Sequence, residues 1–235
     1  MSILTDDNYR YEIKFVLSQK KAEILKYRLS LVMDKDENYE NGEYFIRSLY
    51  FDDIYNNLYY EKVDGLADRE KYRIRFYNFD DSFIVLELKG KTKNNSYKRR
   101  EIITKDEYYS IINDEYDKIN VDNRKLLEEF LRVKKMKGYH ASVIVDYKRI
   151  AFTYPYEDVR ITFDEDVKSS KYNCDLFDKN IPLYNVLEDN SVILEVKYNT
   201  RLPRFLNDVI KTVPMNRIAV SKFQLCDERK EGLYV

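Results

Sequence analysis

Hydrophobic and polar residues alternate with a period of two along much of this chain. Such alternation is typical of β-strands with two chemically different faces, whereas the strands of parallel α/β folds read as continuous apolar runs. The pattern therefore predicts a largely antiparallel sheet. The clear segments are residues 9–17, 44–51, 71–78, 82–89, 142–152, 159–164 and 191–198, with 97–103 and 217–225 as further candidates.

Helical periodicity occurs only between these groups of strands. Ser18 is a candidate N-cap for a helix with apolar residues at 22, 25, 29 and 32, and Thr104 and Glu107 form a capping-box pattern. The predicted helices follow Ser18, cover residues 105–116, run from an Asp122 cap towards Gly138, and start at Pro203 and end at Lys211. Helices that support an antiparallel sheet make an α+β fold. No repeat or linker divides the chain, so a single domain over residues 1–235 is expected.

The composition excludes several classes of protein. Hydrophobic residues make up 44% of the chain and aromatic residues 15%, too much for a disordered chain. No apolar run approaches the roughly 20 residues of a membrane span, and the N-terminus lacks the pattern of a secretory signal. Cys174 and Cys226 are too few for a disulfide framework, which favours a reducing cytoplasm.

The charged residues restrict the chemistry further. Lys and Arg number 41 and Asp and Glu 42, so no global basic field of the kind found in many nucleic-acid binders exists. Any site for a polyanion must be local. His140 is the single histidine, which argues against a His-ligated zinc site, and we interpret it as structural.

The charges are sorted by position within the strands. In several strands the cations share one face and the large apolar residues the other, as with Arg73 and Arg75 against Tyr72 and Ile74. A solvated face would explain any one strand, but not a set so rich in cations within a neutral protein. If the sheet closes with this face inside, its lumen is strongly cationic and needs an anion to neutralise it. The cations of this face are Lys14, Arg73, Arg75, Lys89, Arg149, Arg160 and Lys197, accompanied by Glu12, Glu87 and Glu195.

The shape of such a lumen limits which anion could enter. A nucleic-acid duplex is too wide for a small barrel, and proteins that bind single strands place aromatic residues among the cations for base stacking. Here the aromatic residues mostly lie on the opposite face, so a nucleic-acid ligand is not expected. A phosphoanhydride chain or a nucleoside triphosphate fits best, with carboxylates as ligands for Mg²⁺ or Mn²⁺.

Ten short motifs carry a resemblance to a known family. They are RYEIKF (10–15), SLYFDD (48–53), YYEKVDG (59–65), KYRIRFY (71–77), LELKGK (86–91), SYKRRE (96–101), VDYKRIAF (145–152), VRITFD (159–164), LEVKY (194–198) and SKF (221–223). In this order the chain resembles the catalytic domain of the vacuolar transporter chaperone (VTC) polyphosphate polymerases, a branch of the triphosphate tunnel metalloenzymes. The resemblance implies a closed, eight-stranded antiparallel β tunnel with supporting helices.

The resemblance also implies roles for particular residues. The implied catalytic cations are Lys14, Arg73, Arg75, Lys89, Arg149 and Arg160, and the implied further phosphate contacts are Lys62, Lys98, Tyr147, Ser221 and Lys222. Glu195 is the implied ligand of a divalent metal, Mn²⁺ or Mg²⁺. Two positions depart from the family pattern: Arg10 replaces an acid of the first strand, and Ala219 replaces a basic residue of the last, where Arg217 is a candidate to compensate.

Three functions remain open from the sequence. The first is a metal-dependent polymerase that transfers the ATP γ-phosphoryl group to inorganic polyphosphate, and the second is a triphosphatase on the same scaffold. The third is a polyphosphate-binding module without turnover. The implied partners are ATP or another triphosphate and polyphosphate, in a stand-alone cytoplasmic protein without the regulatory domain and membrane segments of eukaryotic members; protein partners are not predicted.

Overall fold

The fold is α+β, with one large antiparallel sheet and helices packed against it. The computed structural model describes residues 4–5, 10–37, 42–64, 66, 69–92, 95–170, 175–188, 191–218 and 221–231. The strands are β1 (Leu4–Thr5), β2 (Tyr11–Leu17), β3 (Asp34–Lys35), β4 (Glu43–Asp52), β5 (Arg69–Tyr77), β6 (Asp80–Thr92), β7 (Asn95–Ile103), β8 (His140–Tyr154), β9 (Val159–Ser170), β10 (Tyr184–Asn185), β11 (Val192–Tyr198) and β12 (Asn216–Ile218). The helices are α1 (Gln19–Ser30), α2 (Asn57–Val63), α3 (Lys105–Ile112), α4 (Lys125–Lys137), α5 (Arg204–Lys211) and α6 (Lys222–Glu231), with the 3₁₀ turns η2 (Tyr116–Lys118) and η3 (Tyr156–Asp158).

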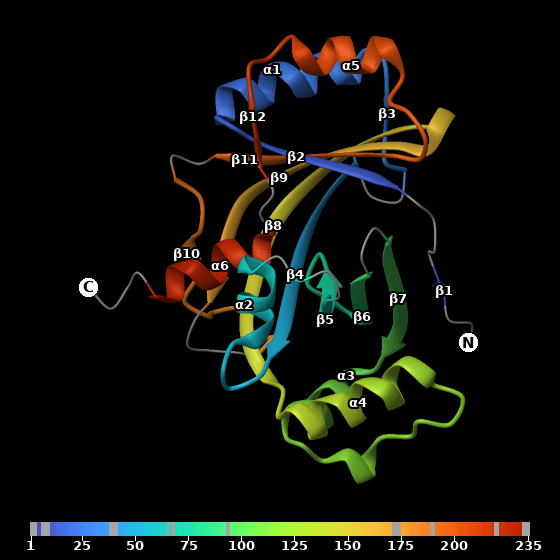
Figure 1. Cartoon of the computed structure of the whole chain (residues 1–235), viewed down its shortest axis with the longest axis vertical. Helices are drawn as coiled ribbons and strands as arrows, with labels where there is room; N and C mark the ends of the chain where they lie inside the picture. Colours follow the sequence, from blue (N-terminus) through green and yellow to red (C-terminus); the bar gives the residue numbers. More distant parts are fainter. Residues whose placement is uncertain are drawn as a thin grey trace.

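The sheet is strongly curved. Its hydrogen-bonded order is β1-β7-β6-β5-β4-β8-β9-β11-β2-β12, with β3 added on β8 and β10 on β9, and every recorded pairing is antiparallel. The long strands β4, β8 and β9 run from the layer of α1 and α5 towards the layer of α3 and α4 (Figure 1). All seven clear strand predictions, and the candidate at 97–103, are confirmed with small shifts of their ends.

The closed eight-stranded tunnel is not confirmed. Within the described ranges the backbone ladder ends at β1 on one side and at β12 on the other, and these two strands do not pair. Side chains of strands inside these edges approach one another across the concave side. Lys89 of β6 places its Nζ 3.6 Å from Oε2 of Glu12 on β2.

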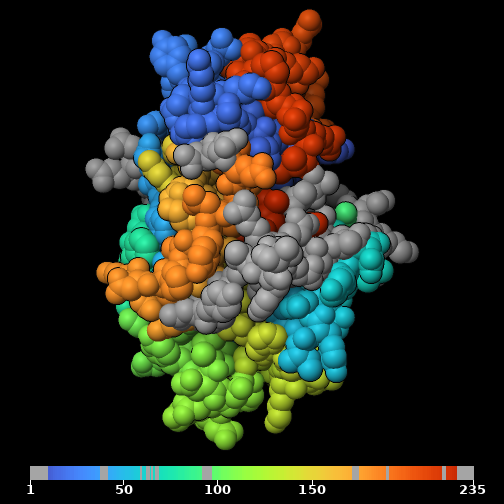
Figure 2. Space-filling model, turned by 90° about the vertical axis from the view of Figure 1, so that its left-hand side faces the viewer, coloured from blue at the N-terminus to red at the C-terminus, as the bar shows by residue number. Residues whose placement is uncertain are grey.

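Two hydrophobic cores pack against the sheet, mostly on its outer face. The larger lies between strands β4, β5, β6 and β8 and helices α3 and α4, and the smaller packs α1 and α5 on β2, β9 and β11. Figure 2 shows that α1 and α5, near opposite ends of the chain, form one end of the molecule, while the α3–α4 region forms the other. The apolar faces predicted from alternation therefore point outwards to the helices, and the charged faces remain on the concave side.

The helix ends follow partly from local sequence. Thr104 and Glu107 form the predicted capping box, and Gly138 ends α4 in the left-handed conformation with φ 64°. The Asp122 cap is wrong, since α4 begins at Lys125. The reason is a distant carboxylate: Glu101 of β7 accepts the backbone N–H of Leu126 (3.2 Å) and that of the next residue (3.3 Å), so no local cap is needed.

The last predicted strand, residues 217–225, is also wrong. β12 ends at Ile218, and α6 follows from Lys222, with Ser221 accepting the backbone N–H of Gln224 on its Oγ at 3.2 Å. Three residues of pairing with β2 are all that remain of the strand. Within the described part of the chain, no helix has the length and apolar character required to cross a membrane.

Candidate functional site

A polar cavity of about 150 Å³ lies on the concave side of the sheet. Side chains from β2, β4, β5, β6, β7, β8 and β11 surround it, and the start of α6 contributes a further wall. Its lining residues are Lys14, Tyr50, Lys71, Arg73, Arg75, Lys89, Lys98, Tyr147, Arg149, Glu195, Lys197, Ser221, Lys222 and Phe223. The volume admits a slender polar ligand, not a bulky one.

Strand β5 shows how alternation builds this site. Arg73 and Arg75 face the cavity, while the alternate residues Tyr72 and Ile74 are 1% and 0% exposed in the hydrophobic core. Arg73 donates from Nε to Glu87 (2.6 Å) and from Nη1 to the hydroxyl of Tyr50 (2.9 Å). The two guanidinium groups are therefore held side by side along one wall.

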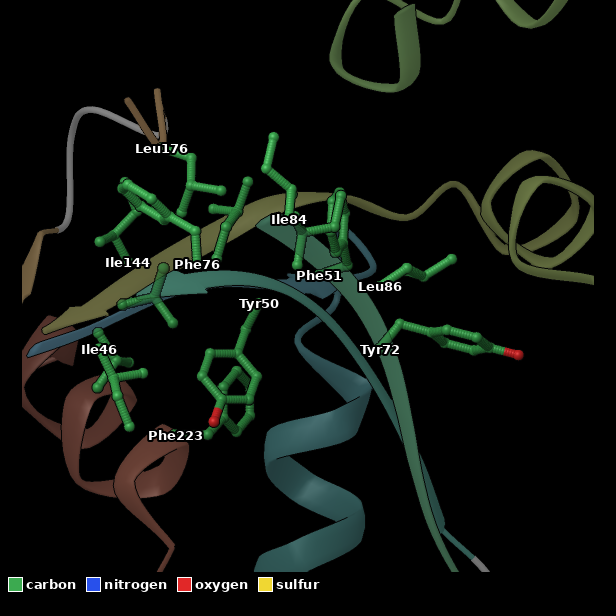
Figure 3. Close-up of a cluster of buried hydrophobic side chains, with 14 of the residues drawn as sticks. Ile46, Tyr50, Phe51, Tyr72, Phe76, Ile84, Leu86, Ile144, Leu176 and Phe223 are labelled. Carbon is green, nitrogen blue, oxygen red and sulfur yellow. The ribbon is translucent and has the colours of Figure 1, made fainter. Parts of the chain in front are cut away.

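The neighbouring strand β4 obeys the same rule. Tyr50 lies on the cavity side, where its ring centroid is 5.2 Å from that of Phe223 on α6. Figure 3 shows Tyr50 and Phe223 together on one side of the strands, with Phe51 and Phe76 on the other. This ring contact fixes the start of α6 against the sheet and brings the residues before it, Ser221 and Lys222, into the cavity wall.

Cations outnumber carboxylates in this region. Among the described residues, nine Lys and Arg side chains line the cavity, whereas four carboxylates form ion pairs with members of this set: Glu12, Glu87, Asp164 and Glu195. The described basic side chains therefore outnumber the acids that pair with them. Converging cations in a partly desolvated space are costly unless an anion joins them.

Arg149 and Lys222 share one buried acid. Arg149 donates from Nε (2.6 Å) and from Nη2 (2.8 Å) to the two carboxylate oxygens of Asp164, which is fully buried, and Lys222 forms an ion pair with the same group. Burial works to raise the pKa of Asp164, but Arg149 and Lys222 outweigh it and lower that pKa. Asp164 is therefore ionised at neutral pH and holds β8, β9 and α6 together.

The cationic surroundings also perturb groups that could bind phosphate. Burial, together with Arg73 and Arg75, holds the pKa of Lys98 well below its usual range, although Glu87 opposes this shift. Burial would raise the pKa of Tyr147, but the positive charges of Arg149, Arg75 and Lys222 lower it. Burial is therefore the larger cause of the lowered pKa of Lys98, and neighbouring positive charges act in the same direction on the pKa values of both groups.

Glu195 is the one carboxylate that lines the described part of the cavity. Its oxygens lie 3.1 Å from Nζ of Lys197, 3.5 Å from those of Lys14 and Lys222, and 3.6 Å from Nη2 of Arg149. Burial works to raise its pKa, but these four cations hold the pKa well below the usual range. Glu195 is therefore ionised and available as a ligand.

The protein side chains could hold a metal ion only together with oxygens from a bound phosphate substrate. The described residues hold no group of three or more His, Cys, Asp or Glu side chains placed to bind a metal ion. Mg²⁺ is commonly held by one or two carboxylates, with the remaining ligands supplied by substrate phosphates and water. Glu195 fits this mode, since it is ionised and faces the space where a phosphate would lie.

The structure brings most of the residues predicted for the site together. Ten of the twelve line the cavity: Lys14, Arg73, Arg75, Lys89, Lys98, Tyr147, Arg149, Glu195, Ser221 and Lys222. Arg160 lies outside this lining, because its Nη2 pairs with buried Asp36 (2.6 Å) and donates to the hydroxyl of Tyr44 (2.9 Å). Lys62 falls in α2, and its side chain is outside the part that the structure describes.

The two departures from the family pattern have different outcomes. Arg10 is tied to Asp158 by an ion pair of 2.8 Å and a hydrogen bond of 2.6 Å to its carbonyl, and it is not part of the cavity lining. Ala219 lies outside the described residues. The suggestion that Arg217 compensates is wrong. Arg217 is exposed and pairs with Phe15 of β2, so the two side chains lie on the same face of the sheet. Lys14, the residue next to Phe15, faces the cavity, so Arg217 lies on the face away from it.

Sequence reasoning left four lining residues out of the predicted site. Alternation placed Lys197 on the charged face, and Lys71 lies two residues before Arg73 in the same strand, so this signal could have included both. Tyr50 and Phe223 had no such signal, since large aromatic residues were expected on the apolar side. Lys71 lies 4.2 Å above the ring of Phe223, so this part of the wall combines cations with aromatic faces.

Comparison with known proteins now identifies the family. The VTC domain matches residues 9–227. The chain belongs to the VTC domain family. A search of curated protein sequences returns no match.

Two solved structures have a similar fold. HpAC1 from Hippeastrum, assigned as an adenylyl cyclase and described as having a dominant triphosphatase activity, has a TM-score of 0.54 at 17% identity, covering 97% of this VTC domain chain and 96% of its own. A protein from Bacillus halodurans assigned as an adenylate cyclase has a TM-score of 0.53 at 13% identity, covering 94% and 96%. At such identities the likeness establishes the fold alone.

Proposed function

We propose that this VTC domain is a metal-dependent polyphosphate polymerase that transfers the γ-phosphoryl group of ATP to a polyphosphate chain. The observation that carries the proposal is the narrow cavity lined by nine described Lys and Arg side chains, with which four described carboxylates pair. A linear phosphoanhydride chain carries about one negative charge on each phosphate and is thin enough to follow such a channel. We further propose that the curved sheet acts as a tunnel for this chain.

The transfer needs positioning more than covalent chemistry. A terminal oxygen of the polyphosphate chain attacks the γ-phosphorus of ATP, the bond from that phosphorus to the β,γ-bridging oxygen breaks, and ADP leaves with the electron pair. Arg73, Arg75 and Arg149 present fixed N–H donors to the non-bridging oxygens, where charge is spread in the transition state. A divalent ion held through Glu195 would supply further neutralisation of the β- and γ-phosphates.

A triphosphatase is the second candidate. It is favoured by the similar fold of HpAC1, which is described as having a dominant triphosphatase activity. The same cations would then hold the substrate while water, rather than a phosphate chain, attacks the γ-phosphorus. A polyphosphate-binding module without turnover would use the same contacts and no metal.

Incubation of the purified protein with ATP and Mn²⁺, with and without a short polyphosphate primer, tests these alternatives. The polymerase predicts a ladder of lengthening chains on a gel and release of ADP, the triphosphatase predicts free phosphate, and the binding module predicts neither. Arg75→Ala is the control for activity at the cavity, since it removes one lining cation. With its two cysteines, the protein is expected to act in the cytoplasm.

A further inference from the structure

Glu87 is a buried acid at the centre of the cationic wall. It lies in the middle of β6, directly opposite Arg73 of β5 on one side and Arg100 of β7 on the other. Its side chain is 0% exposed, and it is not among the residues that line the cavity. It therefore stands behind the phosphate-facing groups rather than beside a ligand.

One carboxylate holds four cations from both neighbouring strands. Its Oε2 accepts from Nε of Arg73 at 2.6 Å and lies 2.6 Å from Nη2 of the same residue and 3.5 Å from Nε of Arg75. Its Oε1 lies 2.6 Å from Nζ of Lys98 and 3.8 Å from Nε of Arg100. No other described carboxylate that pairs with the cavity cations holds two neighbouring arginines of one strand.

Burial of such a group is unfavourable unless it stays ionised and paired. Burial works to raise the pKa of Glu87, but Arg73, Arg75 and Lys98 hold that pKa well below its usual range. The ionised carboxylate of Glu87 in turn orients the guanidinium groups beside it, because the plane of a guanidinium is set by the acceptor that its nitrogens face.

The contacts leave part of Arg73 available to a ligand. Of its five N–H donors, Nε–H donates to Glu87 and one on Nη1 donates to Tyr50, while Nη2 lies 2.6 Å from the same Glu87 oxygen as an ion pair. One donor on each terminal nitrogen is then left for phosphate oxygens. Without Glu87, repulsion between Arg73 and Arg75 would favour other rotamers for both.

We infer that Glu87 is a positioning residue: it orients Arg73, Arg75 and Lys98 for phosphate without touching the phosphate itself. The inference rests on the proposed function, since it assumes that these cations bind a phosphate chain. It predicts that removing the Glu87 charge changes the affinity for an anion in the opposite direction to the change expected from electrostatic attraction alone. Removal of a negative charge from a cationic cavity should tighten the binding of an anion, whereas loss of positioning should weaken it.

The test compares two substitutions that remove the same charge. Tripolyphosphate binding is measured by calorimetry in EDTA for the wild type, Glu87→Gln and Glu12→Gln; Glu12 is the control because it pairs with Lys14, Lys89 and Lys197 but with no described arginine. We expect Glu87→Gln to bind about tenfold more weakly and Glu12→Gln to bind several-fold more tightly. Equal shifts in one direction, or unchanged affinity in Glu87→Gln, would overturn the inference.

Two further measurements keep the inference testable whatever the first result. Glu87→Asp keeps the charge and moves the carboxylate back by one methylene, so weaker binding in this variant supports positioning, and wild-type affinity contradicts it. Nitrogen-edited NMR of the arginine Nε–H groups, without ligand, should show a protected signal for Arg73 that is lost in Glu87→Gln. If wild-type protein does not bind tripolyphosphate, the proposed function fails, while persistence of that protected signal in Glu87→Gln refutes the role of Glu87 separately.

Discussion

Adjacent substitutions on strand β5 offer the most direct test of the cationic cavity. Arg75 and Ile74 are neighbours in sequence but face opposite sides of the sheet, the first lining the cavity and the second buried in the larger core. Replacement of each by Ala should therefore affect different properties of the protein. The expectation follows from alternation in a strand and from the burial of both side chains.

The size of each effect follows from the contacts. Arg75 is 4% exposed, and Arg75→Ala removes a charge-assisted contact to phosphate worth about 1.5–3 kcal/mol, so tripolyphosphate affinity should fall between about tenfold and a hundredfold. Ile74 is 0% exposed, and Ile74→Ala should lower the free energy of unfolding by about 2–5 kcal/mol while affinity changes little.

The assay measures both properties for both variants. Calorimetry with tripolyphosphate in EDTA gives affinity without turnover, and thermal unfolding should show a fall of about 5 °C or more in the Tm of Ile74→Ala. The expected pattern is crossed: one variant loses binding and the other loses stability. If Arg75→Ala binds as tightly as the wild type, and folded Ile74→Ala does not bind, the orientation of β5 and the phosphate site derived from it are wrong.

Three further predictions concern the acids and lysines of the cavity. Glu195→Gln should lower metal-dependent turnover at least a hundredfold, while tripolyphosphate binding in EDTA is retained or becomes tighter, and turnover near the wild-type rate would remove Glu195 as a metal ligand. Burial would raise the pKa of Glu12, but Lys89 and Lys197 outweigh it and lower this pKa from 4.5 to about 2. The ionised Glu12 therefore contributes fully to the free energy of unfolding above pH 4.5, and this contribution is lost as the pH falls towards 2. Measuring Tm across this pH range will check the prediction. The pKa of Lys98 is lowered in the free protein, so a bound anion should raise this pKa and cause proton uptake. Tripolyphosphate affinity should therefore weaken as the pH rises from neutral towards about 10. A binding enthalpy that does not depend on the ionisation enthalpy of the buffer would contradict this prediction.

Local pattern predicted the sheet and its two faces because side-chain direction in a strand depends only on position. Every strand with clear alternation was found, and the cations of one face lie together in the cavity, as Arg73, Lys89 and Arg149 illustrate. The same reasoning placed Arg160 among them. The role of Arg160 stays a prediction, but its partner is a tertiary property that no local pattern contains: Asp36, from a segment far away in sequence, holds its guanidinium outside the cavity lining.

The ends of the elements depend on contacts that no local pattern contains. A cap for α4 was sought at Asp122, but Glu101 supplies it from another strand. Alternation also gave no sign that residues after Ser221 form a helix, whose position is fixed by the contact of Phe223 with Tyr50. Whether the sheet closes could not be predicted from local pattern either, because hydrogen bonding between the edge strands depends on the curvature of the whole sheet.

The acids of the cavity explain how so many cations can coexist before a ligand enters. Glu12, Glu87, Asp164 and Glu195 each form ion pairs with at least two of the nine lining cations, which offsets part of the mutual repulsion. An entering phosphate chain must compete with these carboxylates for the same N–H donors, so the net gain at each phosphate is smaller than nine free cations would give. The proposed polymerase would need this balance, because a product chain held by the full attraction of the wall could not advance after each transfer.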